Sequence, residues 1–433
     1  MRRKLVLCLL LFTGCVQYGI AQDFWRTPLA LNAWSGSESA WSDSIAAKRK
    51  SFVGIEGNIL YGCDGMHNDF LMKMYKGGFI DSAYIEKSAE TLLPSNRVGA
   101  TFGTGITYGR VVNDSTREYI TVSLLRRSMI TGRFSDDAFR LAFQGNQRFK
   151  GEEADFGGTR FNFMSWTQLR IGYVTPKPDS KISFCFSLLA GHNYNQGNIR
   201  YGKLYTDSQG TLLHASVYAD YWSSDTTNRK PFALNGWGTS VDVSWEKTWK
   251  DTFGNKKTLS FDFIDFGFIN WSDRTVHRYA DTSFNYYGID ISQFIINPDY
   301  VTELPEEGDF IKTDTTEFHS SVFLPAIIRG SYVQKFFKNQ LGFKATCAVP
   351  LWSEALPFGS LTGTWSPGHL PVTIETGVAY GGYCGVQVPV GIAFLPGKCN
   401  RFALQAGTSN LLGVVLPDSF SGYGFGINLS YSY

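Results

Sequence analysis

The sequence contains little charge and, beyond its N-terminus, no long hydrophobic run. Charged residues make up 18% of the 433 residues, against about 25% in typical soluble domains. No stretch after the N-terminal segment has the eighteen or more apolar residues of a membrane-spanning helix. The composition is therefore unusual for a soluble protein, and a bundle of transmembrane helices is excluded. The formal net charge of +2 argues against a nucleic-acid partner.

The sequence also lacks the spacings that mark metal and catalytic sites. None of the six histidines lies in an HExxH or similar spacing, and no GxSxG or GxxxxGK motif occurs. The nearest approach to a hydrolase pair is His214 and Ser216, whose positions on one strand lie about 7 Å apart, too far for direct proton transfer. The acidic segment from Asp299 to Asp314 fits a solvated loop better than a cation site. We therefore expect no enzyme activity, no metal and no cofactor.

Glycine and aromatic residues, in contrast, are abundant. The chain has 45 glycines, and 15% of its residues are aromatic. From Tyr423 to Tyr433, every odd position is large and apolar or aromatic, whereas every even position is glycine, asparagine or serine. Only a β-strand places alternate side chains on opposite faces. Strands of about ten residues with one apolar face build transmembrane β-barrels.

The same alternation recurs between turn signals and predicts an antiparallel transmembrane β-barrel of about sixteen strands. Each segment has one apolar or aromatic face and one small or polar face. Fourteen strands is the alternative, because 52–61 and 359–366 show the weakest pattern. The predicted strands are 52–61, 98–109, 118–126, 160–173, 181–190, 198–206, 211–222, 237–249, 258–271, 322–333, 341–351, 359–366, 371–380, 385–395, 402–409 and 422–433.

Strand 258–271 requires an irregularity. Its phenylalanines change parity between positions 263 and 266, and its aspartates change parity between 262 and 265. A one-residue bulge near Ile264 would turn all four phenylalanines outward and both aspartates inward. We predict that bulge, with Asp262 and Asp265 as inward-facing acids.

The connection lengths agree with a barrel that has both termini on one side. With sixteen strands, every connection above eight residues is odd-numbered, and the tight turn at 207–210 is even-numbered. Bacterial outer-membrane barrels have short periplasmic turns and longer outer loops. The odd-numbered connections are therefore the predicted outer loops, of which 272–321 is the longest.

Two odd-numbered connections, 62–97 and 127–159, contain helix-compatible segments. The first contains 68–75 and 82–93, and the second has Ser135 as an N-cap before an apolar run over 138–143. A barrel of this size encloses water unless something fills it. We expect at least one segment to fold into or across the mouth as a plug, with an extracellular cap as the alternative. The candidate plug residues are Phe70, Leu71, Met74, Phe139, Leu141 and Phe143.

The N-terminus has the parts of a secretory signal peptide. Basic residues at 2–4 precede an apolar run over 5–12, and Gly19 and Ala21 are small residues at cleavage spacing. We expect removal of residues 1–21 and a single barrel domain over 22–433, although Cys15 also allows a lipoprotein. Five cysteines would remain, at positions 63, 185, 347, 384 and 399, so at least one is unpaired.

Four short motifs carry a resemblance to a known family. They are FQGNQRF at 143–149, FGGT at 156–159, DFGFINW at 265–271 and GID at 288–290. They resemble an uncharacterised family of outer-membrane barrels from Bacteroidetes-type Gram-negative bacteria, which is distantly similar to the long-chain fatty-acid transporter barrels. The resemblance covers most of the mature chain and implies a barrel with inward-folded segments. It implies no particular activity, because the family has none assigned and fold does not fix function.

Two functional hypotheses follow, both in the bacterial outer membrane. The first is a passive channel or transporter for small molecules, including hydrophobic ones. The second is a structural or interaction barrel, such as a surface adhesin or a subunit of a secretion or surface-assembly complex. In both, outer-membrane lipid surrounds the barrel, and the barrel assembly machinery recognises the aromatic C-terminal strand through Phe425, Tyr431 and Tyr433. The sequence identifies neither the cargo nor a protein partner.

Overall fold

The computed structural model describes residues 50–77, 79–225, 227–228, 230, 232–252, 254–287, 313–337, 340–367, 370–394 and 402–433. The predicted signal peptide, Cys15 and Cys399 lie outside the described residues, as do the GID motif and nearly all of the acidic segment 299–314.

Fourteen antiparallel strands form a closed ring, in which the last strand pairs with the first. This ring confirms the prediction of an all-β antiparallel barrel and the alternative number of fourteen strands. The ring strands are β1 (Ser51–Cys63), β2 (Ser95–Asn113), β3 (Glu118–Ser135), β5 (Arg160–Pro176), β6 (Ser180–Thr206), β8 (Gly236–Lys250), β9 (Lys256–Tyr286), β11 (Ile327–Phe336), β12 (Leu341–Pro350), β13 (Leu356–Trp365), β14 (Val372–Gly382), β16 (Val390–Phe394), β17 (Phe402–Thr408) and β18 (Tyr423–Ser432).

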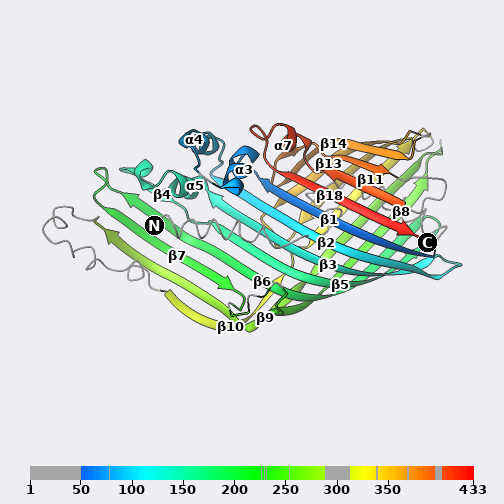
Figure 1. Cartoon of the computed structure of the whole chain (residues 1–433), viewed down its shortest axis with the longest axis horizontal. Coiled ribbons are helices and arrows are strands. Elements are labelled where there is room, and N and C mark those ends of the chain that lie inside the picture. Colours follow the sequence, from blue (N-terminus) through cyan, green and yellow to red (C-terminus); the bar gives the residue numbers. More distant parts are fainter. Residues whose placement is uncertain are drawn as a thin grey trace.

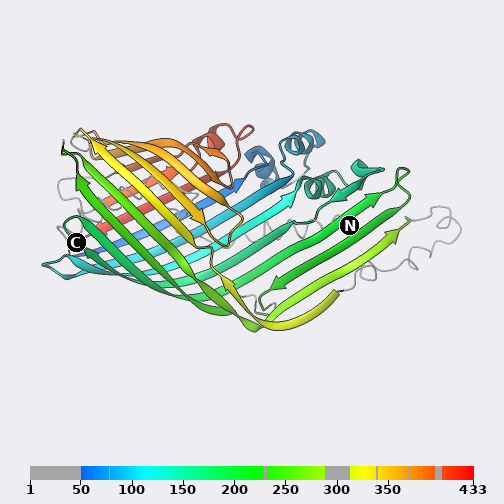
Figure 2. The ribbon, with the colours of Figure 1, turned by 180° about the vertical axis from the view of Figure 1, so that it is seen from behind.

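Four further strands lie outside the ring: β4 (Glu153–Asp155), β7 (Leu213–Ser223), β10 (Thr313–Phe323) and β15 (Val386–Gln387). Strand β7 pairs with residues 195–206 of β6 and 276–286 of β9, whereas β8 pairs with residues 180–191 of β6 and 256–271 of β9. Strand β4 pairs with β6, and strand β10 pairs with β9, each on the side away from β7. We call this sheet, formed by β4, β7, β10 and residues 192–206 and 272–286, the extension. It prolongs one side of the wall well beyond the rest of the barrel (Figures 1 and 2).

The prediction of sixteen strands was wrong because β6 is continuous. Residues 191–197, expected as a loop, run through as strand, with bulges at His192 and Arg200 that each leave one residue without an opposite partner. The predicted strand 211–222 became β7, which belongs to the extension. Two strands are therefore lost from the ring together. Because two strands are removed at once, the long connections keep their odd numbers and stay on the same side of the barrel. The parity of connection lengths therefore could not distinguish sixteen strands from fourteen.

Two predicted connections have strand at their ends. Strand β3 continues to Arg133, which pairs with Arg97 on one side and Arg160 on the other, so the connection predicted over 127–159 begins after Ser135. Strand β9 reaches Tyr286, and β10 begins at Thr313, so the described ends of the predicted loop 272–321 belong to the extension. The regular apolar alternation stops before these ends, where polar and apolar residues are mixed, and the pattern gave no signal there.

The predicted bulge in β9 is present. Val241 pairs with Phe266 and Val243 with Phe263, so Asp242 faces both Ile264 and Asp265. Asp265 has a φ of 59°, in the left-handed region that aspartate tolerates better than most residues. Three of the four phenylalanines are between 37% and 46% exposed on the outer face, and Phe266 is partly buried.

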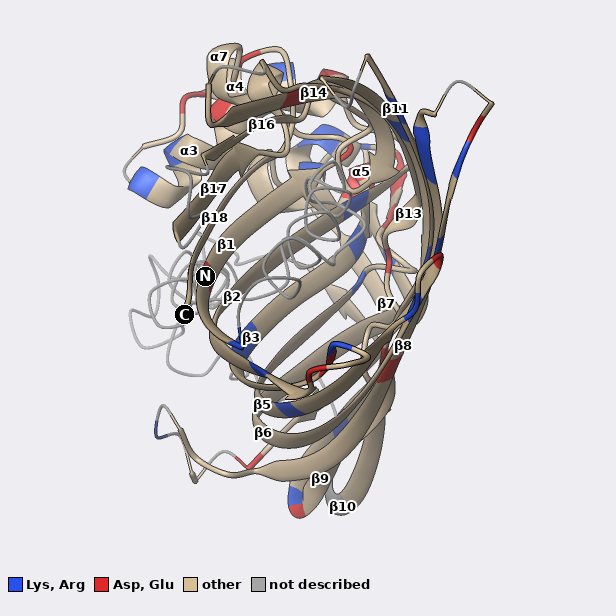
Figure 3. Cartoon of the chain, turned by 90° about the vertical axis from the view of Figure 1, so that its right-hand side faces the viewer, with Lys and Arg blue, Asp and Glu red and all other residues tan. Residues whose placement is uncertain are grey.

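The outer face of the ring carries an apolar belt. On β18, the odd-numbered side chains from Phe425 to Tyr431 are between 37% and 52% exposed, whereas Gly424, Gly426 and Ser430 are buried. On β6, the even-numbered side chains from Ile182 to Leu188 show the same exposure. Figure 3 shows that most residues along the strands are uncharged. Among the described residues, the helices are too short or too polar to cross a membrane.

Candidate functional site: the inner face of the barrel and its extension

A buried layer of charged side chains crosses the interior of the ring. Arg127 on β3 donates from Nη1 to Asp265 Oδ2 at 2.5 Å, and Arg170 on β5 donates from Nη2 to Asp265 Oδ1 at 3.2 Å. The Nε atom of Arg170 also lies 3.0 Å from Oδ2 of Asp242 on β8. All four side chains are less than 8% exposed. Two arginines and two aspartates from four strands thus form a neutral group, which we call the charged layer together with Gln168, whose Nε2 donates to Ser187 Oγ.

Polar groups on β9 and on the strands from β11 to β14 are buried as well. Arg329 on β11 donates from Nε to Asp262 Oδ2 at 2.8 Å. Lys344 on β12 and Glu375 on β14 are each 2% exposed, and Thr362 Oγ1 donates to Glu375 Oε1 at 2.7 Å. A wide aqueous pore would leave its lining accessible to water. These lining side chains are instead buried.

An aromatic cluster lies beside the charged layer, toward the extension. Its buried members are Met164, Trp166, Leu189, Tyr194, Ile269, Trp271 and Leu324. Tyr194 and Trp271 stack with ring centroids 5.4 Å apart and an interplanar angle of 17°. Gly191 lies under Trp271, and a Cβ there would come within 2.9 Å of the indole ring. The guanidinium of Arg127 lies 5.9 Å from the Trp166 ring centroid, which places the cluster directly beside the charged layer.

The inner face of the extension continues this surface. Strand pairing assigns fifteen side chains to the same face as the buried cluster, and they mix aromatic and polar groups. Asp220 accepts from His277 Nε2 at 2.9 Å, and its other oxygen lies 2.7 Å from Arg200 Nε. Trp222 stacks on His277 at 4.6 Å and packs against the aromatic cluster. The fifteen residues are Gln196, Asn198, Tyr201, Lys203, Tyr205, His214, Ser216, Tyr218, Asp220, Trp222, His277, Tyr279, Asp281, Ser283 and Asn285.

The distance argument against a His214–Ser216 pair was wrong. Ser216 Oγ lies 3.5 Å from His214 Nε2, and His214 Nδ1 lies 2.7 Å from Asn285 Oδ1 on β9. The estimate of about 7 Å is the separation of two backbone positions along a strand. It ignored the freedom of the two side chains to lean toward each other, and it could not include an asparagine 71 positions away.

The candidate plug residues lie in a group of helices at one end of the barrel. The predicted helices are present as α3 (Asn68–Lys76), α4 (Ser82–Glu90) and α5 (Asp136–Phe143), and a short helix, α7 (Leu411–Val415), lies beside them. The Ser135 side chain caps α5 by accepting from Ala138 N at 3.1 Å, as predicted. We call this group the rim cluster (Figure 1).

Aromatic contacts hold the rim cluster together. Phe139 and Phe143 on α5 lie with ring centroids 4.6 Å apart, and each is within 5.4 Å of the Phe70 ring on α3. Leu71 and Met74 pack against this group, and Leu141 is partly buried on α5. Asn68 fastens α3 to the start of β18 by accepting from Gly422 N at 2.7 Å. The candidate residues thus seat helices on the rim, and their role as a plug stays a prediction.

Two loops at the same end fold inward. Tyr383, which follows β14, reaches Thr131 on β3, with 2.6 Å between the two hydroxyl oxygens. Burial raises the pKa of Tyr383 to about 12. In the loop between β12 and β13, Glu354 accepts two hydrogen bonds from Arg160, at 2.7 and 2.9 Å. These loops cross from the late strands to the early ones, an arrangement that the sequence does not signal.

The remaining site predictions can be located on the wall. Asp262 and Asp265 lie on the inner face, 8% and 5% exposed. Arg170, a partner of Asp265, occupies an inward position in the predicted strand 160–173, and that parity could have identified it. Tyr431 and Tyr433 stand on the outer face with ring centroids 6.2 Å apart. Within the described part of the chain, no group of three His, Cys, Asp or Glu side chains could hold a metal ion.

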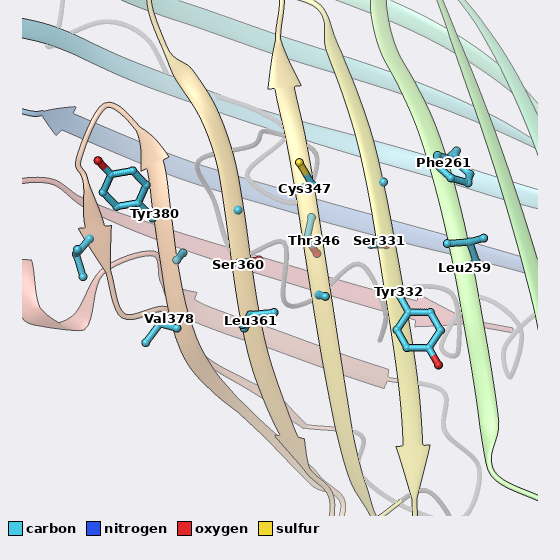
Figure 4. A pocket seen from close by; sticks show the side chains of 15 residues that line it. Leu259, Phe261, Ser331, Tyr332, Thr346, Cys347, Ser360, Leu361, Val378 and Tyr380 are labelled. Carbon is cyan, nitrogen blue, oxygen red and sulfur yellow. The ribbon is translucent and has the colours of Figure 1, made fainter.

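The outer wall also has an open groove of about 700 Å³. Its floor is a row of small residues on adjacent strands, Gly330, Cys347 and Gly359, with Phe261 and Tyr380 at the two ends of the row. Figure 4 shows Leu361, Val378 and Tyr332 beside this row. The groove is a depression in the apolar belt and lies on the other side of the wall from the charged layer.

Comparisons with known proteins show a family without an assigned activity. A solved structure of the toluene transporter TodX from P. putida is 10% identical, with a TM-score of 0.45 over 91% of this chain and 92% of that one. A Pseudomonas aeruginosa FadL homologue is 11% identical, with a TM-score of 0.44 over 90% and 92%. The translocator domain of the autotransporter NalP from Neisseria meningitidis is 6% identical, with a TM-score of 0.32 over 93% and 95%. No curated protein matches. The model of a family of unknown function, DUF5723, matches residues 52–405, and the chain belongs to that family.

Proposed function

We propose that the chain is an outer-membrane β-barrel through which small hydrophobic molecules pass without energy coupling. The observation that carries the proposal is the buried aromatic cluster on the inner face of a ring whose outer face is an apolar belt. The belt suits a barrel surrounded by lipid. The cluster suits an apolar cargo that has left water, because aromatic side chains offer large apolar contact areas. The predicted N-terminal signal peptide and the aromatic C-terminal strand support the outer-membrane location.

The geometry favours a path that the charged layer closes at rest over a permanently open pore. A cargo would arrive along the inner face of the extension, pass Trp222 and reach the aromatic cluster. The charged layer lies beyond the cluster, and an apolar molecule cannot replace its ion pairs. The cargo therefore leaves sideways through the wall, or the charged layer rearranges to let it pass. Ionic conductance of the resting barrel in planar bilayers should accordingly be low.

Two adjacent leucines on β6 provide a matched test. Leu189 is 4% exposed within the aromatic cluster, whereas Leu188 is 52% exposed on the apolar belt. Leu189→Gln places an amide where the cargo would lie, and Leu188→Gln places the same amide on the outside. We would measure uptake of the fluorescent hydrophobic probe N-phenyl-1-naphthylamine by intact cells that express each form.

Wild type and Leu188→Gln should take up the probe several-fold faster than cells without the protein, and Leu189→Gln should lose most of that gain. Folded barrel in each strain is quantified by the mobility shift on heating in SDS gels. Equal uptake with and without wild-type protein would refute the proposal. So would two variants that behave alike at equal folded amounts.

An interaction barrel is the second candidate, and the extension favours it. A five-stranded sheet that projects beyond the belt offers a large polar surface to a protein partner. Purification from native membranes in mild detergent distinguishes the two candidates. A stoichiometric partner that is lost when residues 207–223 are deleted supports the interaction barrel, whereas a partner-free protein with probe uptake supports the channel.

A further inference from the structure

Three side chains on the inner face of the extension form a chain of hydrogen-bonding contacts. Ser216 Oγ lies 3.5 Å from His214 Nε2, and His214 Nδ1 lies 2.7 Å from Asn285 Oδ1. Ser216 and His214 are two residues apart on β7, and Asn285 is the direct cross-strand neighbour of His214 on β9. His214 and Asn285 are exposed to solvent, and Ser216 is partly exposed. A nucleophile, a base and a group that orients the base thus stand in the order that nucleophilic hydrolysis requires.

The asparagine fixes the state of the histidine. An amide oxygen only accepts hydrogen bonds, so Nδ1 of His214 must carry the proton that it donates to Asn285 Oδ1. In the neutral imidazole, Nε2 is then unprotonated and faces the Ser216 hydroxyl. This is the tautomer in which a histidine can remove the proton from a serine. The distance of 3.5 Å is long for a hydrogen bond, as is common in catalytic sites without substrate.

The neighbours of Ser216 provide donors for a developing negative charge. Ser283 on β9 is its direct cross-strand partner, with 2.9 Å between the two hydroxyl oxygens. Lys203 on β6 is its direct partner on the other side, and the Lys203 ammonium ion-pairs with Glu153. Backbone N–H groups in a sheet are engaged in strand pairing, so an oxyanion at this site depends on side-chain donors. A hydroxyl and an ammonium are suitable ones.

We propose that Ser216, His214 and Asn285 form a hydrolytic site for carboxylic esters. Ser216 Oγ attacks the ester carbonyl carbon while its proton moves to His214 Nε2, and Ser283 and Lys203 stabilise the oxyanion. The C–O bond to the alcohol then breaks, His214 returns the proton to the alcohol, and the acyl group remains on Ser216. Water, activated by His214, releases the carboxylic acid and restores the serine. Asn285 is a positioning residue that acts through His214.

The test uses purified full-length protein folded in an ester-free amine-oxide detergent. A fluorophosphonate probe reports a reactive serine, peptide mass spectrometry locates the adduct, and p-nitrophenyl butyrate reports turnover. Wild type should carry the adduct on Ser216. Ser216→Ala and His214→Ala should each lower kcat/KM by roughly a hundredfold or more. Ser208→Ala, at an exposed serine in the neighbouring 207–210 turn, is the matched control and should leave both readouts unchanged.

The role of Asn285 has its own readout. Asn285→Ala should lower kcat on the order of tenfold with little change in KM, whereas Asn285→Asp, which keeps the acceptor oxygen, should restore it. No adduct on Ser216 in the wild type would overturn the proposal. So would equal turnover in Ser216→Ala and Ser208→Ala. Either failure would leave the proposed transport of hydrophobic molecules unaffected.

Discussion

Asp265 is central to the charged layer, because it pairs with both arginines. Asp265→Asn keeps the shape and the tolerance of left-handed backbone but removes the charge that faces Arg127 and Arg170. Its side chain is only 7% exposed, so water cannot take over this role. Removing one partner of a buried ion pair costs about 3–5 kcal/mol, since the remaining charge stays buried. We expect a loss of folding stability in that range.

Two further variants separate charge from backbone. Asp265→Ala removes the charge and also places alanine at a φ of 59°, which adds about 1–2 kcal/mol. In the double variant Asp265→Asn with Arg127→Met, no unpaired charge remains at position 127, and part of the lost stability should return. The order of stability is therefore wild type, then the double variant, then Asp265→Asn, then Asp265→Ala.

The assay is urea unfolding of the barrel in detergent, followed by tryptophan fluorescence, because Trp166 and Trp271 are buried in the adjoining aromatic cluster. Asp273→Asn, at an exposed aspartate on the same strand, is the control and should change the free energy of unfolding by less than about 0.5 kcal/mol. If Asp265→Asn were as mild as Asp273→Asn, Arg127 and Arg170 would not depend on Asp265, and the charged layer would not be a buried ion-pair group.

Three other predictions concern the ends of the molecule. Ser135→Ala removes the α5 cap and should destabilise the rim cluster by about 0.5–2 kcal/mol, seen as faster amide exchange over 136–143, with Ser208→Ala unchanged. Hydrogen bonds from Gln209 N and the Thr211 hydroxyl lower the pKa of Asp207. The ionised carboxylate therefore stabilises its turn at pH values above the usual pKa, and this stabilisation is lost as the pH falls through the lowered pKa. NMR titration of the carboxyl carbon should show a midpoint below 3.8. Deleting Tyr433 should reduce the amount of folded barrel in cells but not its stability once folded, measured by heat-modifiable mobility; an unchanged yield would contradict a role in assembly.

The sequence was most informative in the strands where side chains alternate between the exposed apolar belt and the buried interior of the ring. The belt positions of β6, β9 and β18 could be assigned from period-two patterns alone, and the bulge at Ile264 followed from the parity of four phenylalanines. The pattern weakened beyond the belt. In the extension polar and aromatic side chains are mixed on both faces, so residues 191–197 and 272–286 show no regular contrast between faces even though they are strand.

The candidate site was less predictable, because its contacts join distant segments. Asp265 could be placed inside, but only the closed ring shows that Arg127, 138 positions earlier, is its partner. Tyr383 and Thr131 are 252 positions apart, and no local pattern relates them. The His214–Ser216 pair was visible in the sequence and was rejected on backbone spacing. The missing information was the cross-strand neighbour Asn285, which pairing alone supplies.

The unbroken course of β6 makes the barrel and its extension one mechanical body. Ser187, which accepts a hydrogen bond in the charged layer, and Tyr205, which lies opposite His214, belong to the same strand. A displacement at the tip of the extension is therefore transmitted along this one hydrogen-bonded strand to the interior of the ring. The two bulges of β6, at His192 and Arg200, are the points at which the strand can bend.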